Sequence, residues 1–146
     1  MAQPNTPSTS LQVLIAEDNP VNQMVLRIFL GTLGYSPMIA NNGLEALEAL
    51  KHQTYDVIFM DMQMPKMDGV TATKQIRQDC SQQPWIVALT ANTLPEARQL
   101  CLEAGMNDFV TKQIQIEDIV NIFAKYSSDK ELVKELVKER SLTKNN

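Results

Sequence analysis

The sequence of 146 residues contains few of the residues that build covalent or metal-bound frameworks. It has two cysteines, Cys80 and Cys101, and one histidine, His52. These are too few ligands for a structural zinc site. Two cysteines without a disulfide framework are typical of free thiols in a reducing compartment. The cysteine content therefore predicts a cytoplasmic protein.

The sequence also lacks long apolar runs and an excess of positive charge. No apolar run approaches the roughly 18 residues of a transmembrane helix, so we expect no membrane insertion. The net charge is −4 and the isoelectric point is about 5.0. Non-specific binding to nucleic acid requires a basic surface, so this charge argues against a nucleic-acid partner. Residues 1–10 lack the blocks of a signal peptide, and their polar composition predicts a flexible lead.

Short apolar runs alternate with segments of helical periodicity along the rest of the chain. The runs lie at 11–16, 35–40, 55–61, 84–90 and 107–112. Continuous apolar strands are typical of sheets buried on both faces, and intervening helices imply parallel pairing with right-handed crossovers. We therefore expect an α/β fold with a five-stranded doubly wound parallel sheet and five flanking helices. A barrel of this type would require eight such units.

Residues near the expected helix ends carry start and stop signals. Pro20 suits the first turn of a helix, and Asp68 suits an N-cap. Thr93 and Glu96 have capping-box spacing before a helix that Gly105 is expected to end. Within the helices, apolar residues recur at helical spacing, namely Val21, Met24, Val25, Ile28, Phe29 and Leu33, then Leu44, Leu47 and Leu50, and finally Ile116, Ile119, Val120 and Phe123.

The last twenty residues differ in composition from the rest. We expect one domain over 11–126 and a charged, partly helical extension over 127–146. Its narrow apolar stripe is formed by Leu132, Val133, Leu136 and Val137. Such a helix is marginal alone, so it either continues the fifth helix and pairs with a second copy or another protein, or remains a solvated helix.

Polar residues follow four of the five expected strands. Glu17 and Asp18 end the first strand, Asp61 the third, Thr90 the fourth and Lys112 the fifth. Each has an ordinary explanation by itself, as a cap, a solvated residue or a common strand residue. The carboxyl ends of parallel strands share one edge, however, and ligands bind there. The five residues together therefore predict a functional site.

This set of side chains suits phosphoryl chemistry. Three carboxylates near one ammonium would be costly to bury without further compensation, and oxygen ligands of this kind suit Mg²⁺. Carboxylates act as nucleophiles towards phosphoryl groups, which gives Asp61 a role. A cation such as Lys112 would offset charge on the transferring oxygens, and Thr90 could donate a hydrogen bond to one of them.

Four motifs at these strand ends resemble those of response-regulator receiver domains in two-component signalling. They are IAEDN, MDMQMPKMDG, ALTAN and DFVTK, within about residues 11–126. The resemblance implies a flavodoxin-like fold with strand order 2-1-3-4-5, as in chemotaxis regulators. The form EDNPVNQ is most similar to receivers of hybrid sensor kinases.

The resemblance also implies roles for individual residues. Asp61 would be the phosphoacceptor, and Mg²⁺ would be held by Glu17, Asp18, Asp61 and the backbone carbonyl of Gln63. Lys112 would pair with the phosphoryl group.

Thr90 and Phe109 would form the switch implied by the resemblance. On phosphorylation Thr90 would move inwards and Phe109 would fill the space, which would change the face made by the fourth helix, fifth strand and fifth helix. Phe109 stands where many receivers have tyrosine, so its ring switches by packing alone.

The implied partners are a sensor histidine kinase, a histidine phosphotransfer protein or both, with a downstream protein target and a second copy of the chain as further candidates. The chain would act mainly as a signalling switch. It would catalyse its own phosphorylation from a phosphodonor and its own dephosphorylation.

The sequence departs from the family after the site lysine. Most receivers have proline there, with a cis peptide bond, whereas Lys112 precedes Gln113. A cis bond before a residue other than proline costs roughly 2.5–4 kcal/mol. We therefore expect either a trans bond with a shifted loop or a strained cis bond retained by the site.

Two other functions remain open on the sequence. A haloacid-dehalogenase-like phosphatase also uses an aspartyl nucleophile, but it usually has a second Asp two residues later, where this chain has Gln63. A degenerate receiver would serve as a constitutive interaction module.

Overall fold

The computed structural model describes the backbone of residues 11–144 and the side chains of residues 11–131. The predicted flexible lead at 1–10 lies outside the described residues. The chain divides into two compact units, one up to Ile114 and one from Gln115 onwards.

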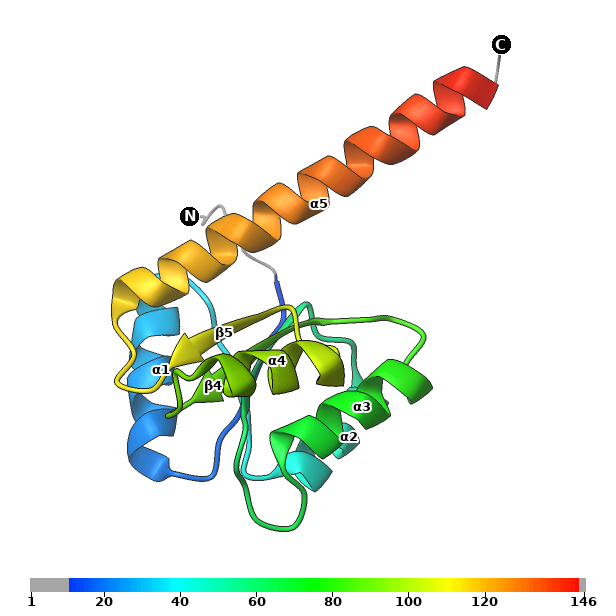
Figure 1. Cartoon of the computed structure of the whole chain (residues 1–146). Coiled ribbons are helices and arrows are strands. Elements are labelled where there is room, and N and C mark those ends of the chain that lie inside the picture. The colour runs from blue at the N-terminus through cyan, green and yellow to red at the C-terminus, as the bar shows by residue number, and fades with distance from the viewer. Residues whose placement is uncertain (1–10, 145–146) are drawn as a thin grey trace. The chain divides into compact units, whose positions relative to one another are not determined.

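The first unit contains a five-stranded parallel sheet in the order β2-β1-β3-β4-β5 (Figure 1). Strands and helices alternate along the chain, so the predicted fold class and strand order are confirmed. The elements are β1 (Val13–Ala16), α1 (Pro20–Thr32), β2 (Met38–Ala40), α2 (Gly43–His52), β3 (Val57–Asp61), α3 (Gly69–Asp79), β4 (Trp85–Thr90), α4 (Pro95–Ala104) and β5 (Asp108–Thr111).

Both faces of the sheet are buried, as continuous apolar strands predict. One face meets α2, α3 and α4, which lie side by side in that order (Figure 1). Its buried strand residues are Leu14, Ala16, Ile58, Met60, Ile86 and Ala88, which pack with Ala46, Ala72, Ile76 and Cys101 of these helices. The alternate strand residues, such as Ile15, Phe59 and Val87, are also fully buried.

The buried face of α1 is narrower than its apolar composition suggests. Leu26 and Leu30 are fully buried, four residues apart on one side of the helix. Val21, Met24 and Ile28 are between 57% and 66% exposed. Helical spacing thus identified the helix, but the helix carries two apolar stripes. Only the packing of the helix decides that the stripe of Leu26 and Leu30 is buried and that the stripe of Val21, Met24 and Ile28 is exposed.

The helix caps agree with the sequence in all but one case. Pro20 stands at the start of α1, and the Asp68 side chain accepts a hydrogen bond from the Thr71 N–H at 2.7 Å, which caps α3. Gly105 ends α4 with a left-handed φ of 104°.

The predicted capping box of α4 is wrong. Leu94, not Thr93, is the N-cap, and it makes no side-chain cap hydrogen bond. Pro95 begins the helix one residue later than a Thr93 cap requires, and the Asn92 side chain accepts the Leu94 N–H at 2.9 Å instead.

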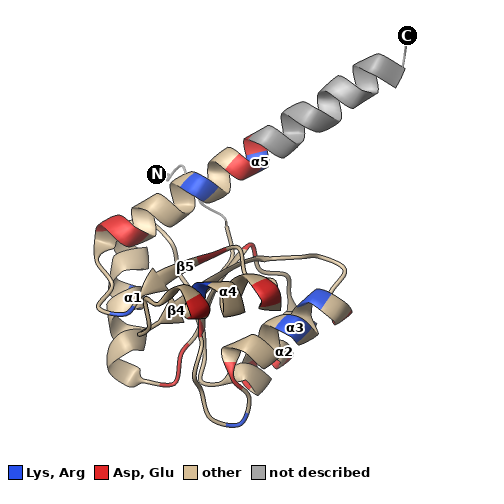
Figure 2. Cartoon of the chain, in the orientation of Figure 1, with Lys and Arg blue, Asp and Glu red and all other residues tan. Residues whose placement is uncertain are grey.

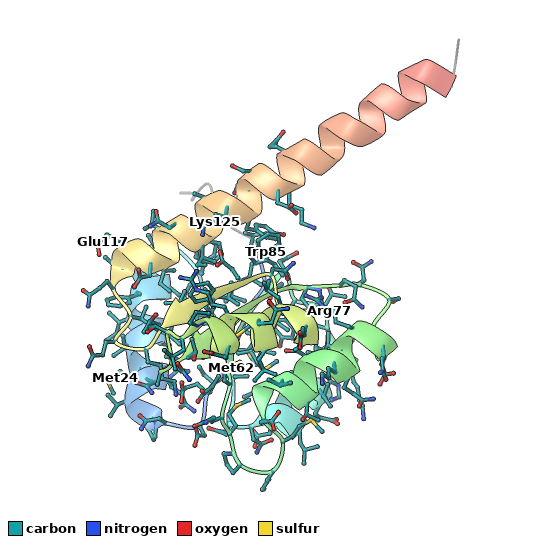
Figure 3. The ribbon with its side chains drawn as sticks, viewed as in Figure 1. Met24, Met62, Arg77, Trp85, Glu117 and Lys125 are labelled. Atoms are coloured by element: carbon teal, nitrogen blue, oxygen red, sulfur yellow. The ribbon has the colours of Figure 1, made fainter. Side chains whose placement is uncertain are left out.

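Arg77 joins α3 to the connection between α4 and β5 (Figure 3). Its Nε donates to the Gly105 carbonyl, and its terminal nitrogens donate to Asn107 Oδ1 and to the Pro84 carbonyl, each at 2.8 Å. The guanidinium thereby fixes where α4 ends and where β5 begins.

The second unit consists of α5 (Ile116–Lys144), a single helix of 29 residues. The predicted helical extension therefore continues the fifth helix, and the expected boundary between 126 and 127 falls inside it. The side chains of its stripe, Leu132 to Val137, lie outside those described. In the part of the chain that the structure describes, every helix is too short or too polar to span a membrane.

Candidate functional site

Three carboxylates meet at the carboxyl edge of the sheet. Glu17 follows β1 and Asp18 is next to it, while Asp61 is the last residue of β3. Parallel pairing places Ala16 opposite Met60, so both strands end at the same level. One oxygen from each of the three carboxylates lies within 4.8 Å of the others. Figure 2 shows the acidic segment that leads into α1.

Lys112 reaches this cluster from the end of β5. Its Nζ lies 3.0 Å from Asp61 Oδ1 and 3.8 Å from Glu17 Oε1. Both carboxylates are almost completely buried, whereas the lysine side chain remains 29% exposed. One ammonium therefore faces two buried acids, so compensation of the negative charge is incomplete.

The cluster contains unpartnered acceptor atoms that suit a cation. Among the described groups, none donates a hydrogen bond to the buried oxygens Glu17 Oε1 and Asp61 Oδ2. Buried acceptors without a donor are costly, and a divalent cation would satisfy both. Asp18 is exposed and gives the cluster an open side.

The Glu17 carboxyl is strongly affected by its surroundings. Burial raises its pKa to about 7, and the negative charge of Asp61 adds to the rise. The Asn19 N–H, which donates to Glu17 Oε2 at 3.0 Å, and the ammonium of Lys112 both oppose it. In the absence of a metal, this side chain therefore holds its proton to an unusually high pH.

The loop after β3 is folded tightly around Asp61. The Gln63 N–H donates to Asp61 Oδ1 at 3.2 Å, and the Gly69 N–H donates to the Met62 carbonyl at 3.2 Å. A Cβ at position 69 would lie 2.1 Å from the Asp61 carbonyl oxygen, so only glycine permits this approach. The loop places Gln63 beside the acceptor, and its carbonyl as a metal ligand stays a prediction.

Thr90 lies next to the cluster, but its hydroxyl bonds elsewhere. Its carbonyl accepts the Lys112 N–H at 2.7 Å, which places it beside the lysine. Its hydroxyl donates to the Asn92 carbonyl at 3.1 Å and accepts the Asn92 N–H at 3.0 Å. The side chain is thus held by the loop between β4 and α4.

Phe109 is not part of the acidic cluster. It lies on β5 opposite Ala88, two residues before the level of Thr90. Its ring is half-buried against the core, and the guanidinium carbon of Arg98 lies 4.4 Å from the ring centroid.

The peptide bond between Lys112 and Gln113 is trans, since no cis bond occurs in the part of the chain that is described. Gln113 instead adopts a left-handed φ of 76°. The ammonium of Lys112 still lies 3.0 Å from Asp61. Of the two alternatives that the sequence left open, the trans bond with an altered loop is therefore the correct one, and the lysine position does not depend on a cis bond.

Three further residues support the site and were not identified from the sequence. Asn19 caps α1 and bonds Glu17, a role that the Asn-Pro pair could have indicated. Gln23 donates to the Glu17 carbonyl and to Asn41 Oδ1, and Arg98 covers Phe109. The contacts with Asn41 and Phe109 have no local sequence signal, because these partners belong to other segments of the chain.

Comparison with known proteins decides the family. A family model described as "Response regulator receiver domain" matches residues 13–124. The chain belongs to the response regulator receiver domain family. The match covers every residue of the acidic cluster, together with Thr90, Phe109 and Lys112.

One relative of this chain is a hybrid histidine kinase. Over 121 residues, the chain is 42% identical to hybrid signal transduction histidine kinase K of Dictyostelium discoideum. The alignment covers 77% of this chain and 10% of that kinase, so the chain spans about a tenth of the length of this relative.

Two solved structures have the same fold. One is the receiver domain of sensor histidine kinase PA1611 from Pseudomonas aeruginosa PAO1, with a magnesium ion coordinated in its active site cleft. It is 38% identical, with a TM-score of 0.73, and covers 80% of this chain and 96% of that one. The other is a chain in the co-crystal structure of the Saccharomyces cerevisiae phosphotransfer protein Ypd1 with the receiver domain of Ssk1. It is 35% identical, with a TM-score of 0.73, and covers 80% of this chain and 88% of that one.

Proposed function

We propose that this receiver domain accepts a phosphoryl group on Asp61 and thereby switches a protein-interaction surface. The observation that supports this most directly is the ion pair between Lys112 and Asp61 inside a cluster of three carboxylates. Asp61 sits at the end of a buried strand, with Gln63 and Lys112 fixing one of its oxygens. The acceptor is thus oriented before the phosphodonor arrives.

The transfer is a simple displacement at phosphorus. A carboxylate oxygen of Asp61 forms a bond to phosphorus as the bond between phosphorus and the donor's leaving atom breaks. The donor would be a phosphohistidine or a small phosphodonor. Lys112 lies close enough to stabilise the negative charge of the transferring oxygens. Hydrolysis of the aspartyl phosphate returns the carboxylate and releases inorganic phosphate.

Glu17, Asp18, Asp61 and the Gln63 carbonyl are the residues that would hold Mg²⁺. The buried oxygens Glu17 Oε1 and Asp61 Oδ2, which have no hydrogen-bond donor among the described groups, fit such an ion. When bound, the ion would supply positive charge next to the phosphoryl oxygens.

Thr90 and Phe109 are the residues that would convert phosphorylation into a change of surface. The Thr90 hydroxyl would exchange its hydrogen bonds with Asn92 for one to a phosphoryl oxygen. Phe109, at present half-buried, would then occupy the space that Thr90 leaves. The side chains of Thr90 and Phe109 would thus form a packing element with two states. The charge of the phosphoryl group would favour one of them.

The proposed partners are a sensor histidine kinase, a histidine phosphotransfer protein or both. The similarity to the hybrid kinase and to the chain crystallised with Ypd1 supports this. A downstream target protein and a second copy of the chain are further proposals. The two cysteines form no disulfide, in agreement with the proposed cytoplasmic location.

Labelling of the intact chain by a small phosphodonor with Mg²⁺ tests the proposal. We expect one phosphoryl group per chain by intact mass, loss of labelling when Mg²⁺ is chelated, and no labelling of Asp61→Asn. Asp79→Asn, at the far end of α3, is the matched control and should label normally. Equal labelling of Asp61→Asn and the parent would overturn the proposal.

One of the two alternatives raised by the sequence loses its support, and the other stays open to the labelling experiment. Membership of the receiver family replaces the phosphatase hypothesis. A degenerate receiver would show no labelling at all, so the same experiment distinguishes it.

A further inference from the structure

The ring of Phe109 is covered by a cation from a neighbouring helix. Arg98 lies on α4 and is exposed, and its guanidinium carbon stands 4.4 Å from the ring centroid. A cation within about 6 Å of an aromatic face is attracted by the ring quadrupole. Because Phe109 has no hydroxyl, this contact and the core are what hold its ring.

A continuous series of bonds connects this contact to Thr90. The Thr90 hydroxyl bonds Asn92, and the Asn92 side chain accepts the Leu94 N–H at 2.9 Å. The Arg98 N–H in turn donates to the Leu94 carbonyl at 3.4 Å, in the first turn of α4. The position of Arg98 is therefore linked to the Thr90 hydroxyl through the loop that begins α4.

We propose that Arg98 is a positioning residue that holds Phe109 in the conformation seen here and so opposes switching. This rests on the proposed function. When Thr90 leaves Asn92, the loop that leads into α4 loses two hydrogen bonds, and the ring moves away from the guanidinium. The contact between Arg98 and Phe109 is thus present in the unphosphorylated conformation and lost in the phosphorylated one.

The expected size of the effect follows from the exposure of Arg98. An exposed cation–π contact corresponds to roughly a two- to five-fold change in an equilibrium, or about 0.5–1 kcal/mol. A ligand that binds the switched state should bind more tightly by that factor once the contact is removed, because less free energy opposes the change.

The test is the affinity of the full chain for beryllofluoride with saturating Mg²⁺, a mimic of the phosphoryl group. We expect Arg98→Met, which keeps most of the apolar stem, to bind roughly two- to five-fold more tightly than the parent. Arg98→Lys keeps a cation and should lie between them. Gln99→Met, an exposed neighbour on α4, should bind like the parent.

A double-mutant cycle separates the contact from general effects on α4. With Phe109→Leu as the background, Arg98→Met should change the affinity by less than about 1.5-fold, because the ring is absent. A second readout needs no phosphoryl mimic. In the chain labelled with 4-fluorophenylalanine, the Phe109 resonance is the one of four that Phe109→Leu removes, and it should shift in Arg98→Met.

The outcomes are distinguishable. Failure of the parent to bind beryllofluoride would overturn the proposed function and this inference with it. If the parent binds beryllofluoride and Arg98→Met binds it with the same or a weaker affinity, the inference alone is overturned. An unshifted Phe109 resonance in Arg98→Met, or the same gain in the Phe109→Leu background, would also contradict it.

Discussion

Glu17 shows how a single buried carboxyl couples protonation to folding. Its pKa is about 7 in the folded chain and 4.5 in its ordinary state, chiefly because burial penalises the charged form. Between these values the folded chain holds a proton that the unfolded chain has lost. Raising the pH therefore favours the unfolded chain.

The metal-free protein should lose stability as the pH rises from about 5 to about 8. The contribution of Glu17 is fully present below its unfolded pKa and lost above its folded pKa, and we expect a fall of about 2 kcal/mol in the free energy of unfolding. Urea denaturation in a chelator, followed by circular dichroism, measures it. Glu17→Gln should flatten this dependence, and an equally steep fall in that variant would assign it to another group.

Gln113 carries the strain of the loop after the site lysine. Its φ of 76° lies in the left-handed region, which costs a residue with a Cβ roughly 1 kcal/mol relative to glycine. Gln113→Gly should therefore raise the free energy of unfolding by about 0.5–1 kcal/mol. Gln53, with an extended φ of −161°, is the matched control, and Gln53→Gly should lower stability instead. A loss of stability in Gln113→Gly would contradict the strain argument.

The starts of α3 and α4 differ in what satisfies their first N–H groups. Asp68 caps α3 by its side chain, whereas at α4 the N-cap Leu94 has no such bond, although Thr93 and Glu96 have the spacing of a capping box. A spacing rule describes one helix end in isolation. The preceding loop decides which residue becomes the cap, and here Asn92 and Pro95 set the helix start.

Asp68→Ala and Thr93→Ala form a matched pair that tests this difference. Loss of the Asp68 cap should cost about 1 kcal/mol, because the Thr71 N–H loses its acceptor. Thr93→Ala should change the free energy of unfolding by less than about 0.5 kcal/mol, as expected for an exposed residue without a cap role. Urea denaturation of both variants gives the comparison. Equal losses would show that Thr93 contributes a cap after all.

At the scale of the molecule, all the site residues belong to the first compact unit. Glu17, Asp18, Asp61, Thr90 and Lys112 precede its end at Ile114. The proposed chemistry therefore uses residues of the first unit, and the proposed role of the later part of α5 is in assembly.

Removal of residues 128–146 should leave Mg²⁺-dependent labelling of Asp61 unchanged, because every proposed ligand and the phosphoacceptor remain. Intact mass after incubation with the phosphodonor measures this. Light scattering of both forms tests the proposed pairing, since a pair held by α5 would separate in the shortened chain. Loss of labelling in a shortened chain that still unfolds cooperatively in urea would contradict the division of roles.

The sequence by itself determined the order of elements, the parallel sheet and the edge at which polar residues gather. Continuous apolar strands and intervening helices leave few other arrangements, and strand ends such as Asp61 then follow from topology. The convergence of Glu17, Asp18 and Lys112 on that residue is a consequence of the same pairing.

Only the tertiary structure decided which apolar stripe of α1 is buried, which residue caps α4 and where the Thr90 hydroxyl bonds. It also decided that Lys112 reaches Asp61 across a trans peptide bond and that Arg98 covers Phe109. These features depend on contacts between parts of the chain that local patterns describe separately. A local sequence pattern determines whether a segment is a helix or a strand. The elements packed against that segment determine which of its side chains are buried and which form hydrogen bonds.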